Sequence, residues 1–447
     1  MPVLLRIYEK KVIFASEKHK NSMTLPEDFK TYTRQLMGDS LYDSFIAGMG
    51  EDAPASIRIN PFKVDAGNMT VAGNSGGVPW CPYGYYLEGR PPFTFDPLLH
   101  SGAYYVQEAS SMFIDHVVRQ IMSSEPISVL DLCAAPGGKS TCAMSALPHG
   151  SVMFSNEPIR LRAAVLAENI IKFGKDGMIV TNNYPADYRK AGMEFDAVIA
   201  DVPCSGEGMF RKDAGAVSEW STDNVAKCRN LQRSIVEDIW PCLRPGGIMV
   251  YSTCTFNAHE DEENVQWIAN EFGADFVEID TKPEWNITGA LTGDMPAYRF
   301  IPGVSKGEGL FMAVLRKHGD SLRGGMRLNE LTALASKRLK IIANGVKAPA
   351  IKGKQTIPDH SEAMSILTPE NKYTRVDIGY DKAIAYLRHE AITLPEDAPR
   401  GIVELTYHGM ALGFAKNLGN RANNLYPQEW RIKSTHIPSD FNPILLW

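Results

Sequence analysis

The sequence lacks several features that would assign a protein quickly to a class. Its seven cysteines form no CxxC pair and show no zinc-ribbon spacing, which excludes those metal and redox motifs. No apolar run is long enough to cross a bilayer, and no secretory signal opens the chain. No internal repeat is present either. We therefore expect a reduced, cytoplasmic, monomeric protein without a membrane anchor or a metal site.

An excess of positive charge is also missing. The 447 residues carry 46 Lys and Arg against 52 Asp and Glu, a net charge of -6, so bulk charge does not attract the protein to nucleic acid. Residues 321–354 are a local exception, with a single acid, Glu330. The basic residues there are Arg323, Arg327, Lys337, Arg338, Lys340, Lys347, Lys352 and Lys354. This segment is either a linker with one solvated helix or a stripe that contacts phosphates.

From residue 127 onward, short apolar runs alternate with helical periodicity. The predicted strands are 128–132, 151–157, 177–182, 195–201 and 247–252. Helices are expected at 28–38, 161–171 and 231–239, and apolar runs at 276–279 and 310–315 suggest an added antiparallel pair. This alternation is typical of βαβ units around a parallel sheet. Further strands at 374–378, 402–407 and 410–416 predict a small β-rich C-terminal domain, with 419–427 as a turn-rich loop.

A turn rich in small residues follows the first of these predicted strands. It reads Asp131-Leu132-Cys133-Ala134-Ala135-Pro136-Gly137-Gly138-Lys139-Ser140. Small residues let a ligand approach the backbone, and helix N-terminal amides would point at it. The turn matches neither GxGxxG nor GxxxxGK[ST], which argues against NAD or ATP as its ligand. Glu157, 26 residues beyond Asp131, stands where a doubly wound fold places the acid that binds ribose hydroxyls.

Two cysteines follow later strands of the same predicted sheet. Cys204 comes after 195–201 and Cys254 after 247–252, so both thiols are expected at one crevice at the carboxyl edge. Asn257 and Glu260 form a possible capping box for the next helix. The run 259–263, HEDEE, lacks the last histidine of HExxH, and we interpret it as a solvated acidic first turn. The remaining cysteines, apart from Cys81, are interpreted as packing residues: Cys133, Cys142, Cys228 and Cys242.

Two thiols behind a cofactor turn suit one demanding reaction. Pyrimidine C5 is a poor nucleophile, but addition of a thiolate to C6 makes C5 enamine-like, so that it can accept a methyl group. The adduct must then lose its C5 proton and expel the thiolate, which requires a base and a second group near the leaving sulfur.

Four blocks of the sequence resemble a known family, in the order in which that family carries them. DLCAAPGGKST, DVPCSGEGMFRKD and YSTCTFNAHEDEENV, preceded by SGAYYVQEASSMF, are similar to the Sun-type RNA cytosine-C5 methyltransferases. More narrowly, they resemble the bacterial RsmF-like (YebU-like) rRNA enzymes. The resemblance implies a Rossmann-like class I methyltransferase domain, an N-terminal accessory region and a C-terminal PUA-like domain. It also implies S-adenosylmethionine as cofactor and small-subunit rRNA as partner.

Roles for individual residues follow from the resemblance alone. Cys254 would be the nucleophile, Cys204 would assist release of the product, and Asp201 would lie between the cofactor and the cytosine amino group. The cofactor would be held by Cys133, Ala134, Ala135, Pro136, Gly137, Gly138, Lys139, Glu157, Asn183 and Asp201. Asn183 stands where the family usually has an acid that contacts adenine, with Asp187 four residues later. An amide can still hydrogen-bond the adenine amino group.

The predicted organisation has five parts. These are an extension (1–22), an accessory RNA-binding region (23–126), a methyltransferase domain (127–317), a basic linker (318–362) and a PUA-like RNA-binding domain (363–447). The predicted activity is transfer of a methyl group from S-adenosylmethionine to cytosine C5 of 16S rRNA, through a covalent bond to Cys254. Three alternatives stay open: a tRNA substrate, a non-catalytic ribosome-assembly factor, and a small-molecule methyltransferase.

Overall fold

The computed structural model describes residues 24–122, 124–319, 328–353, 355–434, 437–438 and 441–447. The chain divides into two compact units, each built from separate stretches of sequence. Unit 1 comprises residues 1–54, 108–164 and 180–342, and unit 2 comprises 55–107, 165–179 and 343–447. Within the described residues, no helix has both the length and the apolar character that a membrane span requires. The predicted extension 1–22, together with Arg323, Arg327 and Lys354, lies outside the described residues.

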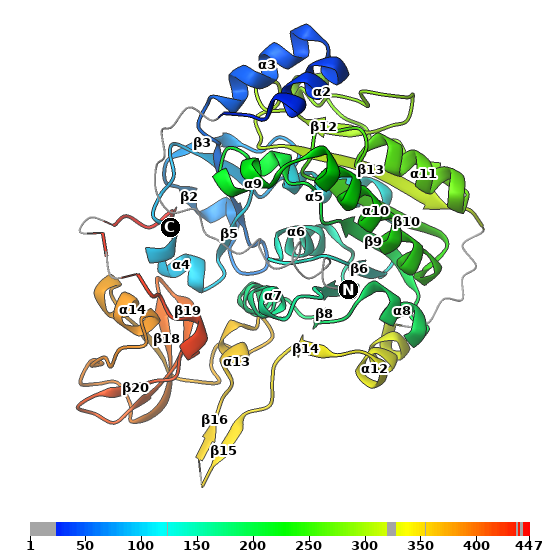
Figure 1. Cartoon of the computed structure of the whole chain (residues 1–447). Coiled ribbons are helices and arrows are strands. Elements are labelled where there is room, and N and C mark those ends of the chain that lie inside the picture. The colour runs from blue at the N-terminus through cyan, green and yellow to red at the C-terminus, as the bar shows by residue number, and fades with distance from the viewer. Residues whose placement is uncertain (1–23, 123, 320–327, 354, 435–436, 439–440) are drawn as a thin grey trace. The chain divides into compact units, whose positions relative to one another are not determined.

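Among the described residues, a nine-stranded sheet contains the predicted parallel strands (Figure 1). Its order is β11 (Ala274–Phe276), β13 (Leu310–Lys317), β10 (Leu243–Thr253), β9 (Phe195–Asp201), β6 (Ser128–Asp131), β7 (Val152–Asn156), β8 (Met178–Thr181) and β14 (Ile341–Asn344). The ninth strand, β12 (Tyr298–Phe300), pairs with β13. Strands β7, β6, β9 and β10 are parallel, whereas β13 is antiparallel to β10. Because the chain returns to the far side of β6 after β8, the strand order reverses between β6 and β9, which is where open α/β sheets bind ligands.

Helices connect and flank these strands. They are α5 (Phe113–Ile121), α6 (Gly138–Ala146), α7 (Arg160–Phe173), α8 (Pro185–Ala191), α9 (Ala214–Glu219), α10 (Thr222–Ile239), α11 (Glu262–Phe272) and α12 (Leu328–Arg338). Helix α5 packs on α6, while α10 packs on both α8 and α11. The packed helices thus form two groups, one around α6 and one around α10. Two groups are expected when right-handed crossovers lead from β6 toward both edges of the sheet.

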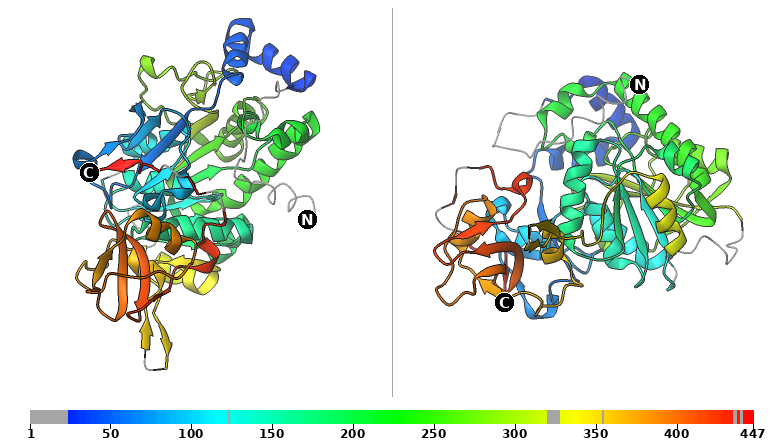
Figure 2. Two further views of the ribbon diagram at one scale, coloured as in Figure 1. Left: turned by 90° about the vertical axis from the view of Figure 1, so that its left-hand side faces the viewer. Right: turned by 90° about the horizontal axis from the view of Figure 1, so that it is seen from below.

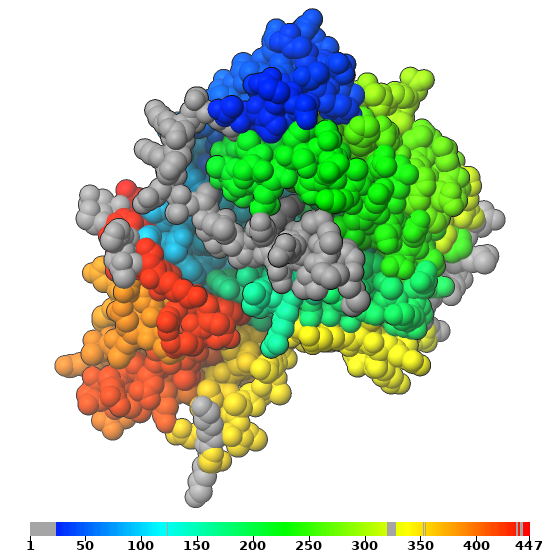
Figure 3. Space-filling view, viewed as in Figure 1, coloured from blue at the N-terminus to red at the C-terminus, as the bar shows by residue number. Residues whose placement is uncertain are grey.

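Two N-terminal helices also belong to unit 1. Helices α2 (Glu27–Met37) and α3 (Asp39–Met49) bury Phe29 and Phe45 against Phe210 and Phe256, and Figure 3 shows them in blue against the green segments. The ring centroids of Phe45 and Phe256 are 4.9 Å apart. Phe256 lies two residues after Cys254, so these helices support the loop that carries this thiol.

Unit 2 contains two four-stranded sheets with one shared apolar cluster. The first has the order β3 (Asn74–Gly77), β4 (Gly84–Leu87), β1 (Ala55–Ile59) and β5 (Tyr104–Val106). The second has the order β17 (Arg375–Asp377), β18 (Gly401–Tyr407), β19 (Met410–Asn417) and β20 (Ala422–Asn424). Unit 2 also contains the short helices α4 (Pro97–His100), α13 (His360–Met364) and α14 (Tyr380–Leu387). Two further strand pairs are β2 (Thr70–Val71) with β21 (Leu445–Leu446), and the hairpin of β15 (Ala350–Lys352) and β16 (Gln355–Ile357). The hairpin extends away from the second sheet (Figures 1 and 2).

The predicted α/β class and most strands agree with the structure. The strand predicted at 195–201 coincides with β9. Of the predicted antiparallel pair, β13 covers the run 310–315, but its partner β11 ends at Phe276, where the predicted run 276–279 begins. Other details differ. β12 was not predicted, β20 lies within the segment predicted to be a loop, and the predicted linker, which holds the expected helix as α12, also contributes the edge strand β14. β12 reads YRF and β20 reads ANN, so neither carries the apolar run by which the other short strands were recognised.

Candidate active site

The turn after β6 is tied to the strand that precedes it. Asp131 is fully buried, and its Oδ2 accepts a hydrogen bond of 2.6 Å from Ser140 Oγ in α6. Gly137 adopts φ 114°, a conformation that glycine reaches without strain, and α6 begins at the next residue. Burial raises the pKa of Asp131 to about 7, and the negative charge of Asp201 adds to this effect.

Glu157 follows β7 directly and is also buried. Its Oε2 lies 3.2 Å from a guanidinium nitrogen of Arg162 in α7, and Arg162 also donates a 3.1 Å hydrogen bond to the carbonyl of Ala135. Arg162 thus joins the acid predicted to bind ribose to the predicted cofactor turn. The sequence analysis did not identify Arg162. The only available signal was a basic residue early in the helix that follows the acid.

Asp201 and Lys139 meet at the reversal of strand order. Lys139 Nζ lies 3.0 Å from Asp201 Oδ2, and Ser252 Oγ donates a 2.9 Å hydrogen bond to Oδ1 of the same carboxylate. Burial alone would lower the pKa of Lys139, but its interactions with Asp201 and with the charge of Cys254 raise it. The lysine is therefore a permanent cation between the cofactor turn and the loops that carry the cysteines.

The two cysteines predicted to share a crevice are adjacent. Cys204 Sγ lies 3.2 Å from Cys254 Sγ; Cys204 is buried, whereas Cys254 is partly exposed. The loops are also joined by the backbone, because Gly208 N–H donates a 2.7 Å hydrogen bond to the carbonyl of Cys254. A Cβ at position 208 would lie 2.8 Å from that oxygen, so the approach requires glycine.

Asn183 lies near the same edge, but its side chain is engaged by the chain itself. Its Nδ2 donates to the carbonyl of Lys340 at 3.2 Å, and its Oδ1 accepts from the N–H of Lys340 at 3.0 Å. Asn156 Nδ2 donates 3.0 Å hydrogen bonds to the backbone carbonyls of both Asn183 and Leu132. An adenine contact by Asn183 stays a prediction, and it would compete with the paired bonds to Lys340.

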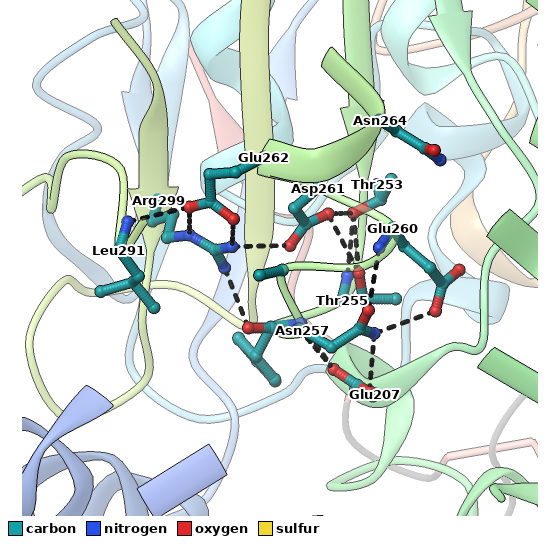
Figure 4. A network of polar contacts seen from close by, with 12 residues as sticks. Glu207, Thr253, Thr255, Asn257, Glu260, Asp261, Glu262, Asn264, Leu291 and Arg299 are labelled. Carbon is teal, nitrogen blue, oxygen red and sulfur yellow. Dashed lines mark hydrogen bonds and ion pairs between the residues drawn. The ribbon is translucent and has the colours of Figure 1, made fainter. Parts of the chain in front are cut away.

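The interpretation of residues 259–263 as a solvated acidic turn is wrong. Glu260, Asp261 and Glu262 are at most 1 % exposed. Figure 4 shows the reason: Arg299, itself 1 % exposed, makes two hydrogen bonds to Glu262 and lies 3.0 Å from Asp261 Oδ2. Asp261 Oδ1 also accepts a 3.1 Å bond from Thr255 Oγ1. The sequence could not reveal this because Arg299 lies on β12, a strand that was not predicted.

The cysteines interpreted as packing residues are all buried. These are Cys133, Cys142, Cys228 and Cys242, with exposed fractions from 0 to 7 %. Burial raises the pKa of the Cys242 thiol to about 11, and that of Cys133 well above its ordinary value, so neither is poised to react.

Comparison with known families gives a consistent result along the chain. The family model described as "16S rRNA methyltransferase RsmB/F" matches residues 121–316, and that of the "N-terminal domain of 16S rRNA methyltransferase RsmF" matches 25–109. The model described as "Methyltransferase RsmF PUA domain" matches residues 373–432.

Similar individual proteins point the same way. A ribosomal RNA small subunit methyltransferase F of Klebsiella pneumoniae (strain 342) is 28 % identical over 469 residues, covering 92 % of this chain and 97 % of its own. The protein of the same name from Vibrio atlanticus (strain LGP32) is 33 % identical over 307 residues, covering 66 % of this chain and 64 % of its own. Among solved structures, a methyltransferase homolog protein from Pyrococcus horikoshii has 24 % identity and a TM-score of 0.56, covering 66 % of this chain and 96 % of its own. NSun6 from Pyrococcus horikoshii with SFG has 18 % identity and the same TM-score, covering 67 % and 100 %.

The sheet order, the glycine-rich turn after β6 and the shared fold define a methyltransferase of the Rossmann-like class, with a C-terminal PUA domain. The three matched regions follow one another along the chain as the RsmF N-terminal domain, the methyltransferase domain and the RsmF PUA domain. The chain belongs to the RsmF family of 16S rRNA methyltransferases.

Proposed function

We propose that this protein transfers a methyl group from S-adenosylmethionine to C5 of a cytosine in small-subunit rRNA, through a covalent intermediate on Cys254. The observation that carries the proposal is the 3.2 Å separation between the sulfurs of Cys204 and Cys254, beside the ion pair of Lys139 and Asp201. Family membership supports rRNA as the substrate, since the curated relatives are named for small-subunit rRNA.

The residues at the strand-order reversal fit S-adenosylmethionine. Among the described residues there, the acids Asp131, Glu157 and Asp201 lie with two cations, Lys139 and Arg162. One acid in excess suits a ligand whose sulfonium, ammonium and carboxylate groups sum to a single positive charge, and such a charge would favour the ionised form of Asp131. Asp131 Oδ1 is buried without a hydrogen-bond partner among the described residues, and can accept one from a ligand. Cys133 through Gly138 would hold the methionine part, and Glu157 the ribose. When bound, S-adenosylmethionine supplies an electrophilic methyl group.

The protein's residues then divide the chemistry. The Cys254 thiolate adds to C6 of the cytosine, so that an S–C6 bond forms and the C5–C6 double bond becomes single. Its electron pair forms a C4–C5 double bond, the C4–N3 pair moves onto N3, and the resulting enamine can be alkylated at C5. Lys139 holds positive charge near Cys254, which favours the thiolate. Asp201 lies beside Lys139, where it can accept a hydrogen bond from the cytosine amino group.

Release needs a second group near the first sulfur. The C5 proton passes to the Cys204 thiolate, the S–C6 bond breaks, and its electron pair returns to Cys254. Cys204 is placed for this step because only 3.2 Å separates the two sulfurs. The target base must also leave its stack to reach the thiols, at a cost of a few kcal/mol unless the RNA is already unpaired there.

Two cysteine variants test the proposal. Cys254→Ala should abolish methyl transfer, whereas Cys204→Ala should leave the RNA covalently attached to the protein after denaturing gel electrophoresis. The probe is small-subunit rRNA from cells that lack the gene, with S-adenosylmethionine. Full activity of Cys254→Ala would overturn the covalent mechanism, and so would a Cys204→Ala protein that carries no RNA.

A further inference from the structure

Two buried carboxylates connect the loops that carry the two thiols, each accepting hydrogen bonds from the loop opposite its own. Figure 4 shows both of them, Glu207 and Glu260, joined through Asn257. Glu207 lies three residues after Cys204, yet its Oε2 accepts the backbone N–H groups of Phe256 (2.6 Å) and Asn257 (3.1 Å), which follow Cys254. The Cys204 loop therefore supplies the acceptor that fixes the Cys254 loop.

Glu260 makes the reverse connection. It follows the Cys254 loop, and its Oε2 accepts the backbone N–H of Ser205, directly after Cys204, at 3.0 Å. The same oxygen accepts a 2.7 Å bond from Gln232 Nε2 of α10. Gln232 Nε2 also donates to the carbonyl of Pro203 at 2.9 Å, so Cys204 is held on both sides.

Asn257 joins the two carboxylates. Its Nδ2 donates 2.9 Å hydrogen bonds to Oε1 of both Glu207 and Glu260. Trp220 Nε1 adds another 2.9 Å bond to Glu207 Oε1. Both glutamates are fully buried, so they act on the thiols through the backbone and through charge, without reaching a substrate. Burial raises the pKa of Glu260 to about 8, and nearby negative charges add to this effect, whereas its own hydrogen bonds lower the pKa. Hydrogen bonds to an ionised carboxylate are roughly twice as strong as neutral ones, so the clamp is strongest when this side chain is charged.

We propose that Glu207 and Glu260 are positioning residues for different steps of the reaction: Glu207 aligns Cys254 for attack on C6, and Glu260 aligns Cys204 for release of the methylated RNA. The inference rests on the proposed function. It follows from which backbone N–H groups each carboxylate accepts: those after Cys254 for Glu207, and the one after Cys204 for Glu260.

The glutamine variants separate the two roles. Both oxygens of each glutamate accept hydrogen bonds, so whichever way the glutamine amide turns, its NH2 group meets an N–H donor and the clamp loses one of its two accepting atoms. Glu260→Gln should accumulate the RNA–protein adduct toward the level of Cys204→Ala, with turnover at least tenfold lower. Glu207→Gln, placed in the Cys204→Ala background, should form the adduct at least tenfold more slowly. A purely structural role would lower both steps together.

The matched control is Glu263→Gln, which changes an exposed glutamate of α11, three residues after Glu260, that pairs with His259. It should leave both adduct level and turnover unchanged. Gln232→Leu, which removes support from Glu260 and the Pro203 carbonyl, should show a weaker form of the Glu260→Gln accumulation and keeps the test available if Glu260→Gln does not fold.

The decisive readout is adduct on denaturing gels, with the full-length protein, S-adenosylmethionine and small-subunit rRNA from cells that lack the gene. If Cys204→Ala traps adduct but neither Glu260→Gln nor Gln232→Leu does, the assignment of Glu260 is wrong. If Glu207→Gln leaves adduct formation at its parent rate, the assignment of Glu207 is wrong. An absence of adduct in Cys204→Ala itself would instead overturn the covalent mechanism.

Discussion

The ammonium nitrogen of Lys139 lies 3.0 Å from a carboxylate oxygen of Asp201, although the two residues follow different strands of the sheet. The pair joins the cofactor turn to the loops that carry the cysteines, and both side chains are at least two-thirds buried.

Replacing Asp201 by Asn tests this pair. The amide keeps the size of the side chain but removes the charge that holds Lys139 and that, under the proposed function, accepts a hydrogen bond from the cytosine amino group. We expect kcat to fall about 100-fold, the scale of losing one hydrogen bond placed for the transition state, while the affinity for S-adenosylmethionine changes less. Steady-state kinetics and calorimetry measure the two. Asp223→Asn, an exposed residue of α10, is the control, and an unchanged kcat in Asp201→Asn would contradict the assignment.

Asp131 makes stability depend on pH. Burial raises its pKa to about 7 in the folded protein, against about 4 in the unfolded chain. Between these values the folded state holds a proton that the unfolded state has lost, so this residue's contribution to stability falls as pH rises from 4 to 7. The loss of unfolding free energy between pH 5 and pH 7 should therefore be about 2 kcal/mol smaller in Asp131→Asn than in the wild type. Urea unfolding of both proteins at both pH values measures this difference. The same change in unfolding free energy in the wild type and in Asp131→Asn would contradict the prediction.

Arg299 is the cation that makes burial of two carboxylates possible. Removing one partner of a buried ion pair leaves uncompensated charge and typically costs about 3–5 kcal/mol. Arg299→Met should therefore lose stability on that scale, because Asp261 and Glu262 keep their buried sites. Lys30→Met, which breaks an exposed pair with Glu27, should cost at most about 1 kcal/mol. Denaturant unfolding compares the two, and similar small losses would contradict a structural role for Arg299.

The basic segment 321–354 makes a further prediction. Lys337 and Arg338 are exposed at the end of α12, as a phosphate-contacting stripe requires. If they contact phosphates, the dependence of RNA affinity on salt should weaken by about one unit of logarithmic slope for each charge removed. Lys337→Gln and Arg338→Gln each remove one charge and are measured by RNA binding across a salt series, with Lys227→Gln, at an exposed position of α10, as the control. A slope unchanged by either variant would favour the solvated-helix interpretation.

Motifs at strand ends could be predicted from the sequence because they are local. The turn from Asp131 to Ser140 and the positions of Cys204 and Cys254 depend only on recognising where each parallel strand ends. A parallel sheet then brings these ends together without further information.

Partners that lie far away in the sequence could not be predicted. The acidic run 260–262 has the pattern of a solvated helix start. Arg299, on a three-residue strand, makes burial of Asp261 and Glu262 favourable, and N–H donors that include Gln232 do so for Glu260. Asn183 carries no sign that its amide binds the backbone of Lys340, 157 residues later. In both cases a buried polar group is explained by a partner that no periodicity predicts.

The central claim is methylation of cytosine C5 in small-subunit rRNA, and bisulfite sequencing tests it most directly. RNA is compared from cells with the gene, without it, and with the Cys254→Ala version. We predict at least one cytosine of small-subunit rRNA that resists conversion only when the wild-type protein is present. Identical conversion in all three strains, or a difference confined to tRNA, would contradict the account.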